Sequence, residues 1–516
     1  MRWARRLAIA ISLVLAATAP RAQTLTFGNN ATVTSIDPHF YTATPIIEVT
    51  REIFDGLTAM RADGSIGPAL AEAWSPVAPD IWEFRLRPGV TFQDGTPFTA
   101  DDVAFTIDRV PQVPNSPGSL VIFTASIARV EVVSPLVVRL HTKGPDPLVP
   151  ANLAWVGMLS RRIHEGATTA GFNEGRLAIG TGPYRLVSFT PGERVELARN
   201  ETYWGPRPHW ERAVNRTIRN AAARTAALLS GDVDVINGVP TADLARLRAD
   251  PRLALEETVG LRIVFLHLDS LRDETPFATG LNGEKLAANP LRDLRVRRAL
   301  SMAIDRNALT ERVMEGSAVP SAQLVREGLS GYVPGLLPAY DPAASRRLLA
   351  EAGFPGGFRL TLHGPNDRYP NDARVLQAIG QMWQRIGVQT VVDAQPWTTY
   401  SARQGRQEFT ASLMGGTAVT SEASYPLRSI LNLRDEARTN RRYNNPAFEA
   451  VLDEAGRTPD PAAREPLLQR AVRMAMEDVA IAPLYIQKAT FASRRGLTFE
   501  PRVDEMLSIS AVRTAP

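Results

Sequence analysis

A few groups of residues have types and spacing that could support chemistry. Asp101 and Asp102 are adjacent carboxylates, which could act as a general acid and base or hold a cation. The segment 232–237, DVDVIN, is similar to the start of a calcium-binding loop, but the third oxygen ligand would fall on Ile236, so the spacing fails. The sequence has no G-x-S-x-G, no H-E-x-x-H and no cysteine, and its six histidines form no cluster. These patterns predict neither an enzyme nor a metal site, and no cofactor is expected.

The paired carboxylates fit the start of a helix better than a catalytic site. Thr99 followed by Asp102 is a capping box in its acidic form, placed just before the apolar positions Val103 and Ile107. Carboxylates at a helix N-terminus also interact favourably with the helix dipole. We therefore interpret Asp101 and Asp102 as cap and dipole residues.

Two neighbouring arginines are a second candidate for chemistry. Arg297 and Arg298 could bind phosphate, but Val296 and Leu300 fall at helical spacing within the segment 291–320. This pattern predicts an amphipathic helix with both arginines on its solvated face.

The clearest structural signal is a hairpin in residues 180–205, GTGPYRLVSFTPGERVELARNETYWG. Strands are expected over 184–189 and 194–199, because apolar and polar residues alternate in the second of them. Between them, Pro191 presets φ and Gly192 supplies the positive φ of a type II turn.

The rest of the chain alternates between predicted strands and helices. Apolar strands are expected over 261–268 and 481–491, and a loop is expected to begin at 395–397. The other predicted elements are strands at 24–29, 82–86, 358–364 and 388–393, a hairpin over 128–141, and helices at 46–57, 146–161, 341–353 and 373–386.

Several short sequence motifs occur in a fixed order along the chain. G-T-G-P-Y, P-G-E and R-N-x-x-Y-W-G follow one another in 180–205, and V-R-R-A-L-x-x-A-I-D-R spans 296–306. In these motifs the chain resembles the family 5 extracellular solute-binding proteins, the dipeptide-, oligopeptide- and nickel-binding components of ABC importers. The resemblance covers nearly the whole chain and does not specify a ligand.

The resemblance implies an α/β, two-lobed periplasmic-binding-protein fold of the large class, with an extra inserted α/β subdomain and a ligand cleft between the lobes. By the same resemblance, the strands 261–268 and 481–491 would cross between the lobes and act as the hinge. The expected boundaries are 23–55, 183–262 and 488–516 for lobe I, 56–182 for the inserted subdomain, and 263–487 for lobe III.

The same resemblance suggests which residues contact the ligand. Peptide-binding members carry, in the segment equivalent to 409–429, a tryptophan and then an aspartate that pairs with the α-ammonium group. Here these positions fall near Gly416 and Val419, which leaves Glu422 as the nearest acid. Because a buried ammonium group needs a paired charge, either Glu422 replaces the aspartate or the ligand lacks a free amine. The full set of predicted ligand contacts is Tyr41, Thr42, Thr44, Arg368, Tyr369, Gly416, Thr417 and Glu422.

The first 22 residues predict secretion. Residues 1–22 hold four arginines, an apolar run and small residues before the expected cleavage site, which is typical of a signal peptide. Without a cysteine the chain cannot be a lipoprotein, so a free periplasmic protein is expected. Cleavage would lower Lys+Arg from 58 to 54, equal to the 54 acids, so nucleic acid and anionic membranes are not expected partners.

These observations predict a monomeric periplasmic substrate-binding protein of an ABC importer. It would capture a peptide or peptide-like solute by lobe closure and deliver it to inner-membrane permease subunits, without spanning the membrane itself. The alternatives are a non-peptide ligand (an opine, a nickel chelate or an oligosaccharide), a receptor-linked sensor, and a periplasmic hydrolase whose triad is distant in sequence.

Overall fold

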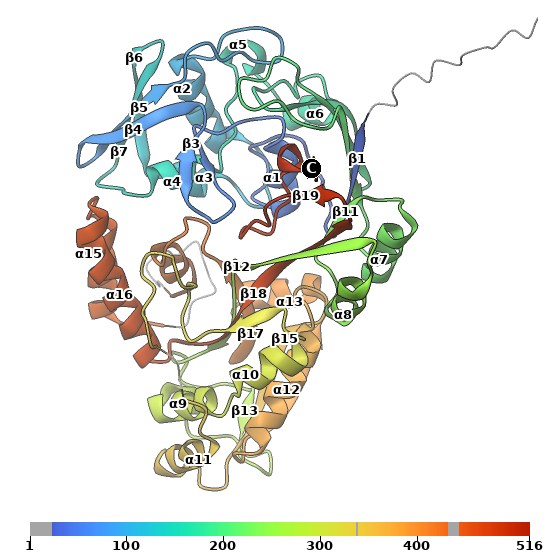
Figure 1. The fold of residues 1–516 in the computed structure, drawn as a ribbon. Coiled ribbons are helices and arrows are strands. Elements are labelled where there is room, and N and C mark those ends of the chain that lie inside the picture. Colours follow the sequence, from blue (N-terminus) through green and yellow to red (C-terminus); the bar gives the residue numbers. More distant parts are fainter. Residues whose placement is uncertain (1–22, 337–338, 432–442, 516) are drawn as a thin grey trace, which may run out of the picture.

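The computed structural model describes residues 23–336, 339–431 and 443–515, so the predicted signal peptide lies outside the described residues. Two lobes lie one above the other in Figure 1, and the long strands β12 and β18 run between them. Within the described residues, one mixed sheet joins both lobes, in the order β13-β15-β17-β12-β18-β11-β1-β10-β9-β8.

Lobe I is built around β1 (Thr24–Asn29), which pairs in parallel with both β10 (Arg212–Thr217) and β11 (Val235–Asn237). The predicted hairpin is confirmed as β8 (Tyr184–Thr190) and β9 (Arg194–Arg199), and φ of Gly192 is 80°. The helices of this lobe are α1 (Thr44–Thr50), α7 (Ala221–Ser230) and α8 (Thr241–Ala249).

The two predicted crossing strands pair with each other. They are longer than expected, with β12 at Leu253–Leu268 and β18 at Ile481–Arg494. Their antiparallel register shifts between Val259 and Ile263, next to Gly260. Because a register shift bends a strand pair, this is where a hinge is expected.

Lobe III carries the predicted βαβ unit: β15 (Arg359–Pro365), α12 (Asp372–Gln384) and β16 (Gln389–Gln395), with parallel pairing between the strands. Beside it, β17 (Ala411–Thr417) pairs with β12, and β14 (Ala318–Pro320) pairs with β18. The other elements of this lobe are β13 (Ala278–Thr279), α9 (Leu294–Met302), α10 (Arg306–Ala308), α11 (Pro342–Glu351), α13 (Trp397–Gly405), α14 (Ser424–Pro426), α15 (Pro446–Gly456) and α16 (Pro461–Glu477).

The inserted subdomain has its own antiparallel sheet, which lies above α15 in Figure 1. In strand β5 (Ile81–Leu86) the side chains of Trp82, Phe84 and Leu86 are buried, as their alternation with polar residues predicts. The capping box of α2 (Ala100–Arg109) is confirmed, because the backbone N–H of Thr99 donates to Asp102 Oδ2 at 2.8 Å. The sheet order is β4 (Ala71–Ala78), β5 (Ile81–Leu86), β7 (Val137–Thr142) and β6 (Ile127–Ser134), and the smaller elements are β2 (Thr58–Met60), β3 (Ile66–Pro68), α3 (Val121–Thr124), α4 (Val149–Leu153), α5 (Arg161–His164) and α6 (Thr169–Asn173).

Some predicted elements are wrong in extent or type. The helix expected over 46–57 ends at Thr50, because the carbonyl groups of Glu52 and Ile53 accept hydrogen bonds from Tyr184 and Gly182 instead. The helix expected over 146–161 shrinks to α4. The loop expected from 395–397 is instead the start of α13.

The prediction that Arg297 lies on the solvated face of its helix is wrong. Arg297 is buried rather than solvated, and its guanidinium donates to the backbone carbonyl groups of Leu291, Arg292 and Asp478. The carbonyl of Asp478 lies 181 residues further along the chain, so helical periodicity could not reveal this acceptor. Arg298 is exposed, as predicted.

The two glycines of G-T-G-P-Y lie against the end of the first helical segment. A Cβ at Gly180 would overlap the carbonyl oxygen of Ile53, and one at Gly182 would lie 2.6 Å from the carbonyl carbon of the same residue. Only glycine allows this close backbone approach.

We expect Gly180→Ala to lower the free energy of unfolding by about 2 kcal/mol, because the added methyl group must displace backbone rather than a side chain. Urea unfolding measures this, with Gly405→Ala as the control, since a Cβ at Gly405 meets nothing within 4 Å. Equal stability of the two variants would contradict the steric explanation.

Candidate functional site

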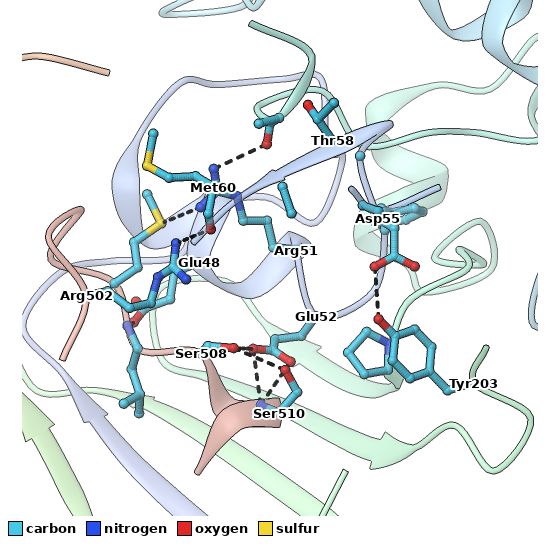
Figure 2. Close-up of a pocket in the computed structure, with 18 residues that line it drawn as sticks. Glu48, Arg51, Glu52, Asp55, Thr58, Met60, Tyr203, Arg502, Ser508 and Ser510 are labelled. Carbon is cyan, nitrogen blue, oxygen red and sulfur yellow. Dashed lines mark hydrogen bonds between the residues drawn. The ribbon is translucent and has the colours of Figure 1, made fainter. Parts of the chain in front are cut away.

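A cavity of about 210 Å³ lies between α1, the C-terminal segment and the start of the inserted subdomain (Figure 2). Glu48 Oε1 accepts the backbone N–H of Leu507 at 2.7 Å, and Glu52 Oε1 accepts that of Ile509 at 2.7 Å. Arg51 lies 3.3 Å from Asp504 in an ion pair. These bonds fix the C-terminal segment against α1, so this cavity is bounded by structural contacts.

The side chain of Asp55 joins two of the sequence motifs that occur in 180–205. Its carboxylate accepts hydrogen bonds from Thr181 Oγ1 at 2.9 Å, Trp204 Nε1 at 2.9 Å and the Tyr203 hydroxyl at 3.3 Å. The donors come from G-T-G-P-Y and from Y-W-G, at the two ends of the hairpin. The motif is therefore structural.

Burial raises the pKa values of the carboxyl groups around this cavity. The pKa of Glu48 rises to about 8, that of Glu52 to about 7 and that of Asp55 to about 6. Desolvation of the charged form is the largest cause in each case, and the hydrogen bonds received by each carboxyl group oppose it.

We expect stability to fall by about 1–2 kcal/mol between pH 7 and pH 9. A folded-state pKa above the unfolded value means that the folded protein binds more protons, so this contribution is lost as the pH rises through about 8 for Glu48. Urea unfolding at several pH values tests this. Glu48→Gln should flatten the profile in that window, and an unchanged slope in this variant would assign the effect to other groups.

A larger cavity, of about 600 Å³, lies between the inserted subdomain and lobe III. Its volume falls within the range typical of small-molecule sites. The inserted subdomain contributes Ile122, Ala125, Ser126, the loop 143–148 and Asn152; lobe III contributes Glu422, Ser424, Tyr425, Arg428, Ser429, Ala455 and Gly456.

Hydrogen bonds beside this cavity join its two walls. The indole N–H of Trp155 donates to the carbonyl of Val419 at 3.0 Å, and Ser421 Oγ donates to the carbonyl of Gly64 at 2.6 Å. Arg326 donates to the carbonyl of Asp63 at 2.8 Å. The lobes are therefore in contact in this structure.

Glu422 lines the larger cavity but is already bonded. Its side chain is buried, its Oε2 lies 2.5 Å from Arg464 Nη2, and its Oε1 accepts the hydroxyl of Ser424. Burial raises the pKa of Glu422, while the Arg464 charge and the Ser424 hydroxyl oppose that shift. Glu422 therefore has an internal partner for its charge.

The predicted loop residues of lobe I lie beside the inserted subdomain. The ring of Tyr41 lies against Gly118, and the backbone N–H of Thr42 donates to the Gly118 carbonyl at 2.9 Å. Thr44 is the first residue of α1. All three are half-buried, and none of them lines either cavity.

The other predicted residues meet on lobe III. The hydroxyl of Tyr369 accepts the backbone N–H of Gly415 at 2.9 Å, next to Gly416 and Thr417 on β17. Arg368 is exposed, and its guanidinium carbon lies 5.2 Å from the Trp397 ring centroid.

The glycines of β17 make room for side chains of the protein itself. A Cβ at Gly415 would lie 2.8 Å from the Tyr369 ring, and one at Gly416 would lie 2.8 Å from Ile430. The side chains of Tyr369 and Ile430 therefore fill the space beside β17. Of the eight predicted residues, Glu422 alone lines either of the two cavities.

Sequence reasoning missed three residues at the larger cavity and its rim: Asp146, Trp155 and Arg464. Trp155 and Arg464 carry no local signal, because their partners are more than 40 residues away. Asp146 does carry one, since it lies between Pro145 and Pro147 in a rigid turn sequence.

The described residues contain no group of three or more His, Cys, Asp or Glu placed to hold a metal ion. Nor does the described part of the chain form a helix with the length and hydropathy needed to cross a bilayer.

The family model described as "Bacterial extracellular solute-binding proteins, family 5 Middle" matches residues 65–437. The chain is 28% identical over 438 residues to the Heme-binding protein A of Haemophilus influenzae, covering 79% of this chain and 76% of that protein. It is 26% identical over 517 residues to the Dipeptide-binding protein of Escherichia coli, covering 94% and 93%.

Solved structures share the fold. The periplasmic binding protein DppA of Helicobacter pylori, in complex with the peptide STSA, superposes with a TM-score of 0.78 at 22% identity, over 95% of this chain and 98% of that one. The two-lobed architecture predicted from the sequence is thereby confirmed.

Proposed function

Since the chain belongs to the bacterial extracellular solute-binding proteins of family 5, we propose that it captures a peptide or peptide-like solute for an ABC importer. The solute would bind in the 600 Å³ cavity and be passed to permease subunits in the inner membrane. The observation that carries this proposal is the position of the cavity, which has one wall on the inserted subdomain and the other on lobe III.

A cavity with walls on two lobes couples binding to closure. A solute that contacts both walls favours the closed state by the difference between its affinities for the closed and open states. A micromolar solute gains about 8 kcal/mol in total, so a few kcal/mol can favour closure. The hydrogen bond from Trp155 to Val419 and that from Ser421 to Gly64 would form in the same step.

The location, the oligomeric state and the lobe boundaries in this proposal are those predicted from the sequence. Residues 1–22 would direct the chain to the periplasm, where it acts as a free monomer. The lobe boundaries would lie at 55/56, 182/183, 262/263 and 487/488, which places the last two in or beside the paired strands β12 and β18.

Non-peptide solutes are the second candidate, and one observation favours them. Glu422 is the acid nearest to the position where peptide-binding members carry an amine-binding aspartate, and its charge is taken up by Arg464. An opine, a nickel chelate or an oligosaccharide would not require that carboxylate.

Thermal unfolding of the chain without residues 1–22 tests the proposal. A panel of di- to pentapeptides, their N-acetylated forms, opines, sugars and nickel chelates is added at high concentration. A ligand at about 100 times its Kd adds about 2.7 kcal/mol of stability, and small-angle scattering should then show compaction. Stabilisation by non-peptides alone would select the second candidate, and stabilisation without compaction would contradict lobe closure.

A further inference from the structure

Two carboxylates line the 600 Å³ cavity from opposite walls. Asp146 belongs to the inserted subdomain and Glu422 to lobe III. They are close enough for the charge of Asp146 to oppose ionisation of Glu422. Their different bonding decides which of them is available to a solute.

Glu422 is held by its own lobe. Its two oxygens accept hydrogen bonds from Arg464 and Ser424, and only 3% of the residue is exposed. Nε of Arg464 is buried without a hydrogen-bond partner among the described residues. A solute that drew Glu422 away would leave this guanidinium without its charge partner in a buried site, which is costly.

Asp146 differs from Glu422 in how its carboxylate is bonded within the protein. Its Oδ1 accepts the backbone N–H of Leu148 at 2.8 Å, whereas no described Lys, Arg or His nitrogen forms an ion pair with it. It is half-exposed and lines the cavity, so its second oxygen can be reached by a solute.

The surroundings of Asp146 hold it in place before any solute binds. Pro145 and Pro147 restrict the backbone on both sides. The indole N–H of Trp82 donates to the Asp146 carbonyl at 2.8 Å. A carboxylate that is fixed in this way loses little conformational entropy when it binds a cation.

The same loop also offers a positive charge. Lys143 lies three residues before Asp146, lines the cavity and is exposed. Arg428, on the opposite wall, forms an ion pair with Asp453 at 3.3 Å. The available charges are thus one carboxylate and one ammonium group on a single loop, which complement a zwitterion.

We propose that Asp146 binds the ammonium group of a solute that carries a free primary amine, and that Glu422 has no direct role in amine recognition. This inference rests on the proposed function and specifies the solute as zwitterionic. Amine recognition then comes from the inserted subdomain, while lobe III closes over the solute from the other side.

The test compares binding of trialanine, tetra-alanine and their N-acetylated forms to the wild type, Asp146→Asn and Asp108→Asn, by isothermal titration calorimetry. Asp108 is an exposed aspartate on α2 and serves as the matched control. We expect Asp146→Asn to weaken binding of the free-amine peptides by about 10- to 100-fold, as for loss of a charge-assisted hydrogen bond. The acetylated peptides should lose affinity little, and the control should behave as the wild type.

Three results would overturn the proposal. If Asp146→Asn keeps the preference for free amines, another group recognises the ammonium, while peptide capture stands. If the wild type binds acetylated and free peptides equally, no amine is recognised and peptide capture again stands. If no peptide binds, both the inference and the peptide form of the proposed function are wrong. Thermal unfolding without ligand shows whether each variant is folded.

Discussion

Replacing Arg109 by Met should lower the free energy of unfolding by about 3–5 kcal/mol, because it leaves a buried carboxylate without its partner. Arg109 donates to both oxygens of Asp37, at 3.0 and 2.7 Å, and Asp37 is fully buried. The same guanidinium lies 2.9 Å from His39 Nδ1 and 4.9 Å from the Phe172 ring centroid.

The ion pair also positions the loop that leads to the predicted ligand contacts Tyr41 and Thr42. Asp37 Oδ1 accepts the backbone N–H of His39 at 3.0 Å, and Asp37 Oδ2 accepts the hydroxyl of Thr169 at 2.8 Å. Although burial raises the pKa of Asp37, Arg109 holds it below its ordinary value. We therefore expect Arg109→Met to disturb this loop as well as to destabilise the fold.

Urea unfolding of Arg109→Met, Asp37→Asn and the double variant measures this coupling. Arg129→Met is the control, because that arginine is exposed and its ion pair with Glu131 contributes little. We expect the double variant to be less destabilised than the sum of the single variants. Additive effects would show that the two residues act independently.

Replacing Arg464 by Leu should have an effect of similar size, about 3–5 kcal/mol, for the same physical reason. Arg464 on α16 neutralises Glu422, and both side chains are almost fully buried in lobe III. Without Arg464, Glu422 must either stay charged in a buried site or bind a proton. Both outcomes destabilise the wall of the 600 Å³ cavity.

Arg473→Leu is the matched control, since Arg473 lies on the same helix and is exposed. The double variant Glu422→Leu with Arg464→Leu should recover part of the lost stability, because apolar residues often replace a buried ion pair at little cost. A double variant less stable than either single variant would show that the pair is needed for packing beyond its charge.

Local sequence signals predicted most of the secondary structure. The turn residues Pro191 and Gly192 gave the hairpin, the Thr99 and Asp102 capping box gave the start of α2, and alternation in β5 gave its buried face. These signals succeed because each depends on φ preferences or hydrogen bonds within a few residues. The helix expected over 46–57 was too long because its last carbonyl groups bond to Gly182 and Tyr184, more than 120 residues away.

The sequence by itself determined the family motifs, the hairpin and the presence of the two crossing strands of this protein. The tertiary structure alone decided which charges are free. Glu422 was the acid nearest the expected position, yet Arg464, 42 residues further on, neutralises it, while Asp146 approaches the same cavity from the inserted subdomain. Residue type and spacing cannot show this, because a buried charge is compensated by whichever partner the fold brings within a few ångströms.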